Sequence, residues 1–88
     1  MKSREYVRHY RLFLERLKQA RQESGLTQAE VARRLSKPQS FISKFESGER
    51  RLDIVELQYL AKIYNKPLTY FQLVSTDSRM PRRTVPTS

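Results

Sequence analysis

Residues 27–48 read TQAEVARRLSKPQSFISKFESG, and this stretch decides the fold because it holds two short helical patterns separated by a turn. Thr27 followed by Glu30 predicts a capping box, in which each side chain accepts a hydrogen bond from the backbone of the other residue. Pro38 predicts the start of a second helix, since its fixed φ and missing N–H suit the first helical position. It also forces the preceding residue out of the α region, which ends the first helix. Gly48 predicts the end of the second helix, so the stretch reads as two helices joined by a tight turn.

Further helices are predicted on both sides of this stretch. Apolar residues recur every three or four positions between residues 8 and 24, which indicates a helix with one buried stripe that ends at Gly25. Downstream, Asp53 followed by Glu56 predicts a second capping box at the start of another helix. Residues 68–74 predict a short fifth helix. The sequence therefore predicts an all-α fold, a compact five-helix bundle that contains a helix-turn-helix.

Three parts are expected along the chain. Residues 1–9 are polar and are expected to form a frayed N-terminal extension, and residues 10–74 are expected to form the helix-turn-helix domain. Residues 75–88 contain two prolines and no apolar periodicity, which predicts a disordered basic C-terminal tail. A chain of 88 residues is expected to form one small domain.

The composition restricts the class of partner. The net charge of +9 favours binding to a polyanion, and nucleic acid is the usual one, although a basic soluble protein or an acidic membrane surface also fits this charge.

The chain has no cysteine, so disulfides and thiolate metal sites are excluded, and no metal or cofactor is expected. No apolar run approaches membrane-spanning length, and no signal peptide is apparent. We therefore expect a cytoplasmic protein.

The segments TQAEVARRL (27–35) and QSFISKFESGERRLD (39–53) resemble the helix-turn-helix of the phage repressor and Cro family, also called XRE-type. The resemblance extends from about Arg11 to Phe71. It implies a lambda-repressor-like DNA-binding domain with a helix at 38–47 that reads the major groove of double-stranded DNA. The implied protein is a bacterial or phage-encoded transcriptional regulator. We expect a repressor that binds an inverted-repeat operator as a homodimer.

The helix at 38–47 carries the candidate base-contacting residues. Because Ile42 and Phe45 point inward, the polar side chains of this helix point outward. The candidates are Gln39, Ser40, Ser43 and Lys44. Glutamine pairs with adenine through two hydrogen bonds, lysine contacts guanine acceptors, and serine contacts either base, although an ordinary solvated face is the alternative for each residue. Phe41 lies off the buried stripe, so it either contacts DNA, at a thymine methyl or the sugar-phosphate, or packs as a flank of the core.

A second group of residues is expected at the sugar-phosphate backbone. The resemblance implies that Gln28, in the first turn of its helix, binds a phosphate and supports the neighbouring Gln39. Three residues at and after the end of the reading helix are also expected to contact phosphates, namely Ser47, Arg50 and Arg51. The resemblance further implies that Arg21 pairs with Glu46 as a structural salt bridge.

The sequence favours DNA binding over other classes of function. Catalysis is not expected, because the chain has one histidine, no cysteine and no convergent set of catalytic groups. The main alternative is an antitoxin or adaptor module of the same fold that acts through protein–protein contacts. A dimer seam is expected at four apolar residues near the end of the domain, Leu68, Tyr70, Leu73 and Val74. These residues alternatively complete the core or are scattered surface apolars.

Overall fold

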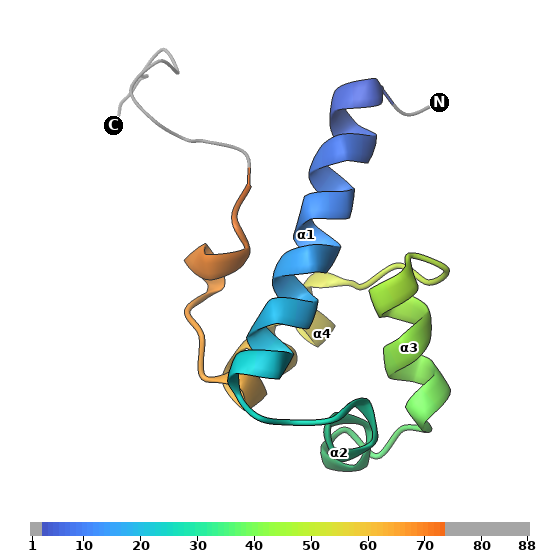
Figure 1. Ribbon diagram of the computed structural model, residues 1–88, viewed down its shortest axis with the longest axis vertical. Helices are drawn as coiled ribbons and strands as arrows, with labels where there is room; N and C mark the ends of the chain where they lie inside the picture. The colour runs from blue at the N-terminus through green and yellow to red at the C-terminus, as the bar shows by residue number, and fades with distance from the viewer. Residues whose placement is uncertain (1–2, 74–88) are drawn as a thin grey trace.

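The computed structural model describes residues 3–73, and the regular structure in this range is entirely helical. Figure 1 shows its elements, which are α1 (Arg4–Glu23), α2 (Gln28–Arg34), α3 (Gln39–Ser47), α4 (Ile54–Tyr64) and the 3₁₀ turn η1 (Leu68–Phe71). The α1 and α3 helices pack against each other, and the N-terminal part of α1 projects beyond the other helices. The predicted tail at 75–88 and Val74 of the predicted seam lie outside the described residues.

The predicted fifth helix is wrong, because the described residues contain four α-helices followed by a single 3₁₀ turn. This turn follows Pro67, lacks a side-chain cap and gives way to extended backbone at Gln72. Only Phe71 of the turn is fully inserted in the core. A segment with one buried anchor gains too little from packing to offset the cost of forming further helical turns.

Two predicted helix starts also differ from the structure. The α1 helix begins at Arg4 rather than near Arg8, because the hydroxyl of Ser3 accepts a hydrogen bond from the backbone N–H of Tyr6 and caps the helix. Pro38 has an extended ψ of 157° and is the N-cap of α3, so this helix begins one residue later than predicted, at Gln39. The resulting α3 has no side-chain cap at its start.

The turn between α2 and α3 depends on one serine. Ser36 adopts a φ of 57°, and the N–H of the next residue, Lys37, donates to the carbonyl of Ala32 at 2.9 Å. This bond closes the end of α2 in the manner that usually requires glycine. Gly48 ends α3 at a φ of 89°, and a Cβ there would lie 3.3 Å from Cδ1 of Leu14 on α1. The turn and the end of α3 together fix how α3 crosses its neighbours.

The core joins all four helices and the 3₁₀ turn. Its buried residues are Leu14, Leu17, Ala20, Val31, Ala32, Ile42, Phe45, Leu60, Ala61, Tyr64 and Phe71. Burial raises the pKa of the Tyr64 hydroxyl, because the phenolate is poorly solvated there. Among residues 3–73, none of the helices is both long enough and apolar enough to cross a bilayer.

Candidate nucleic-acid interface

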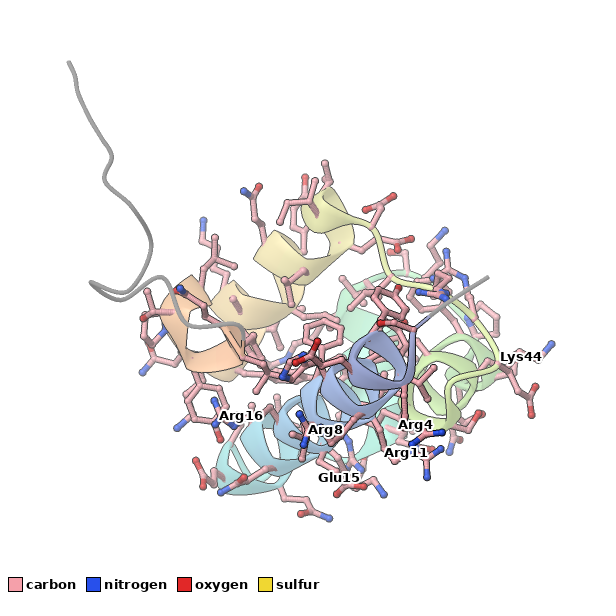
Figure 2. All side chains as sticks on the ribbon, turned by 90° about the horizontal axis from the view of Figure 1, so that it is seen from above. Arg4, Arg8, Arg11, Glu15, Arg16 and Lys44 are labelled. Carbon is pink, nitrogen blue, oxygen red and sulfur yellow. The ribbon has the colours of Figure 1, made fainter. Side chains whose placement is uncertain are left out.

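The outward side of α3 is polar and accessible, as the sequence predicts. Ile42 and Phe45 are fully buried, whereas Gln39, Ser40 and Lys44 are exposed and Ser43 is half-buried. Figure 2 shows the side chain of Lys44 pointing away from the body of the protein. None of the residues from Gln39 to Lys44 is acidic, so this part of the helix does not repel phosphate.

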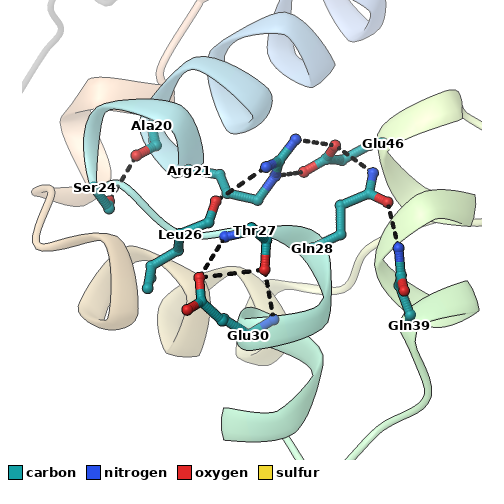
Figure 3. Close-up of polar contacts among 9 residues, drawn as sticks. All are labelled: Ala20, Arg21, Ser24, Leu26, Thr27, Gln28, Glu30, Gln39 and Glu46. Carbon is teal, nitrogen blue, oxygen red and sulfur yellow. Dashed lines mark hydrogen bonds and ion pairs between the residues drawn. The ribbon is translucent and has the colours of Figure 1, made fainter.

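A chain of hydrogen bonds connects α1 to the first residue of α3 (Figure 3). Arg21 donates from Nε to Oε2 of Glu46 at 2.7 Å and from Nη2 to Oε1 at 3.1 Å. Nε2 of Gln28 donates to Oε1 of Glu46 at 2.9 Å, and Oε1 of Gln28 accepts from Nε2 of Gln39 at 3.3 Å. The structure thus contains the predicted pair of Arg21 with Glu46 and the predicted contact of Gln28 with Gln39. Because the side chains of Arg21 and Glu46 are mostly buried, this pair holds the helices in place.

The ion pair at the start of this chain is shielded from water. The side chains of Arg21 and Glu46 are 13% and 3% exposed. The hydrogen bonds to the Glu46 carboxylate raise the pKa of the Arg21 guanidinium, against the opposing effect of burial. Arg21 also donates from Nη1 to the carbonyl of Leu26 at 3.0 Å, which fixes the loop before α2. These contacts use the Arg21 guanidinium inside the protein.

The contact with Gln28 orients the amide of Gln39 and still leaves it able to read a base. The hydrogen bond uses one of the two N–H groups of Gln39. Its carbonyl oxygen and second N–H are the acceptor and donor that a bidentate pair with adenine requires. The geometry therefore suits the adenine-reading role predicted for this residue.

Two serines of α3 bond to their own helix. The Ser43 hydroxyl donates to the carbonyl of Ser40 at 3.3 Å, and the Ser47 hydroxyl donates to the carbonyl of Lys44 at 3.0 Å. A contact that requires either hydroxyl to donate to DNA must replace this internal bond. The two serines therefore have less to gain from DNA than Gln39 and Lys44.

Arg50 holds the connector between α3 and α4 in place, a role that the sequence did not predict. Its Nη1 and Nη2 donate to the two carboxylate oxygens of Glu56 at 3.2 and 2.8 Å. These bonds raise the pKa of Arg50 and lower the pKa of Glu56. The guanidinium carbon also lies 4.2 Å from the centre of the Phe41 ring.

Phe41 is half-buried and meets Phe45 edge to face, with ring centroids 5.8 Å apart. This contact fits the alternative in which Phe41 packs as a flank of the core.

Arg51 connects the same loop to α1. Its guanidinium carbon lies 5.5 and 4.5 Å from the ring centres of Tyr6 and Tyr10, and Nη1 donates to the Tyr6 hydroxyl. The two tyrosine rings are nearly parallel, with centroids 6.1 Å apart. The sequence allows Tyr6 to fold onto the domain from a frayed segment, but it does not predict the contact with Arg51. Ser3 as a helix cap and the i, i+4 spacing of the tyrosines were the signals that could have found it.

Within the part of the chain that the structure describes, no three metal-ligating side chains lie close enough to hold an ion.

A family model described as helix-turn-helix matches residues 17–71, which is more than half of the chain. The protein therefore belongs to the XRE-type helix-turn-helix family, whose members are DNA-binding transcription regulators. No match was found among curated proteins or solved structures. The matched region begins within α1, so residues 4–16 of that helix precede it.

Proposed function

We propose that this protein recognises a specific sequence in double-stranded DNA by placing α3 in the major groove, and that it represses transcription by occupying an operator. Gln39 and Lys44 are the main base-reading residues, with Ser40 and Ser43 at the same surface. Gln28, Ser47 and Arg51 contact phosphates, whereas Arg50 serves chiefly to hold the connector. These phosphate contacts position the protein without specifying sequence.

The hydrogen-bonded chain from Arg21 to Gln39 is the observation that carries this proposal. A glutamine on a merely solvated helix face does not need a fixed orientation. Here the first residue of α3 is held through Gln28 and a buried carboxylate. Fixing a polar side chain before binding lowers the entropy lost in the complex, which is what a base-reading residue requires.

Selection of binding sites from random duplex DNA tests the proposal. We expect an enriched inverted repeat, since one such domain reads few base pairs and two copies on half-sites supply specificity. Gln39→Ala should lose about 1–3 kcal/mol of discrimination at one position of each half-site. Gln58→Ala, at an exposed glutamine on α4, is the matched control and should retain the parent's preference. Uniform binding of all sequences by the parent would refute sequence-specific recognition.

A partner-binding module, such as an antitoxin or adaptor, is the second candidate because α4 exposes an apolar surface. Ile54, Val55 and Tyr59 are 61%, 55% and 61% exposed. Val55 and Tyr59 line a groove of about 350 Å³ together with Phe41. In the predicted seam, by contrast, Tyr70 and Leu73 are half-buried and Leu68 is 42% exposed. The start of α4 thus competes with the predicted seam as the surface that joins two copies or binds another protein.

The mass of surface variants, measured by sedimentation, distinguishes the start of α4 from the predicted seam as the dimer surface. If two copies meet at the start of α4, Tyr59→Asp should halve the mass of a dimeric parent while Leu73→Asp leaves it unchanged. The reverse result assigns the dimer to the predicted seam. A monomeric parent that also selects no DNA sequence would favour the partner-binding module over the repressor.

A further inference from the structure

The part of α1 that precedes the family-matched region carries three exposed arginines on one side. Arg4, Arg8 and Arg11 are spaced by four and three residues, which places them in a row along the helix. Figure 2 shows them on the same side of α1, with Arg16 on another. We propose that this row, here termed the arginine ridge (Arg4, Arg8 and Arg11), binds DNA phosphates beside the bases that α3 reads. This proposal rests on the proposed DNA-binding function.

The spacing and charge of the arginine ridge suit a DNA strand. With a rise of 1.5 Å per residue, Arg8 and Arg11 lie about 6 and 10 Å along the helix from Arg4. Each strand of DNA presents a phosphate about every 3.4 Å of the duplex axis, so the three side chains can meet different phosphates. On this side of α1 the next acidic residue is Glu15, which follows the ridge toward the helix C-terminus. Guanidinium groups bind phosphate in a bidentate manner, which favours this anion over a diffuse negative surface.

The ridge is held in a fixed position relative to the reading helix. Arg51 lies over Tyr6 and Tyr10 and bonds to the Tyr6 hydroxyl, which ties this part of α1 to the connector that follows α3. Arg11 lines a groove of about 440 Å³ together with Ser47 and Gly48 at the end of α3. One end of the ridge is therefore continuous with the surface proposed to contact DNA.

The paired replacement Arg8→Gln/Arg11→Gln tests the ridge, because glutamine keeps the helix propensity of arginine and removes its charge. Arg33→Gln/Lys62→Gln removes the same charge from exposed residues outside the ridge, and neither position lines the groove of Phe41, Val55 and Tyr59. Affinity is measured across salt concentrations on the selected site and on a random duplex. Thermal unfolding checks that each variant is folded.

We expect the ridge variant to flatten the slope of log affinity against log salt by about two units on both duplexes. Its affinity deficit relative to the parent should therefore shrink about tenfold between about 50 and about 200 mM salt. Its preference for the selected site over the random duplex should be unchanged. The control variant should keep the slope of the parent.

Two results would overturn the proposal that the arginine ridge binds DNA phosphates. One is an unchanged slope in the ridge variant, which would make the row a solvated surface or a site for another anion. The other is an equal change in the control variant, which would assign the effect to net charge. Failure of the parent to prefer any site would instead refute sequence-specific recognition, while a slope difference on the random duplex would still support the ridge.

Discussion

Arg21→Ala is expected to lower the free energy of unfolding by about 3–5 kcal/mol, because it leaves the Glu46 carboxylate buried without its counter-ion. The donor that remains, the side-chain amide of Gln28, is neutral and cannot replace the positive charge of Arg21. A small domain has only about 5–15 kcal/mol of total stability, so this is a large fraction. The thermal midpoint, followed by circular dichroism, should fall by at least about 12 °C.

The double variant Arg21→Met/Glu46→Leu is the control for this experiment. It removes both charges and keeps side-chain volume, and such a replacement of a buried ion pair is often neutral or stabilising. We therefore expect it to unfold at a higher temperature than Arg21→Ala. It should still weaken base discrimination, since Gln28 loses the carboxylate that orients it. A stability loss in Arg21→Ala below about 1 kcal/mol would show that water already screens the pair.

Helix boundaries that depend on residues three or four apart followed from the sequence. Both predicted capping boxes are present, with Thr27 and Glu30 bonding reciprocally at the start of α2 and Asp53 and Glu56 at the start of α4. The left-handed residue that ends α3, Gly48, was also predicted. Each of these features is decided by the local backbone, so a short stretch of sequence contains the necessary information.

Contacts between distant segments did not follow from local pattern. Arg51 and Tyr6 are 45 positions apart, and their contact depends on α1 beginning early enough to pass the connector. The pairing of Arg50 with Glu56 was not predicted, because it depends on how α3 and α4 pack, and the phosphate contact of Arg50 stays a prediction. The pair of Arg21 with Glu46 was predicted only through the family resemblance, since no local rule joins residues 25 positions apart. The base and phosphate contacts remain predictions, because their geometry depends on bound DNA.

The second large effect is expected for Phe45→Ala, which should cost about 3–5 kcal/mol of unfolding free energy. Phe45 is fully buried and lies on α3, a helix of nine residues that has no side-chain cap at its start. A helix this short is stabilised mainly by packing of its apolar side, so a cavity at Phe45 weakens the whole element. Urea unfolding measures the loss as a lower midpoint.

Phe41→Ala is the matched comparison, because Phe41 lies on the same helix and contacts Phe45 edge to face but is only half-buried. Its removal should cost less stability than removal of Phe45, since less apolar area is lost. An equal loss would contradict the assignment of Phe45 as the main anchor of α3.

Site selection with Phe41→Ala, carried out under conditions where both the variant and the parent are folded, distinguishes the two roles considered for the Phe41 ring. A packing role leaves the selected sequence unchanged, whereas a thymine contact would make the variant lose its preference for thymine at one position of each half-site.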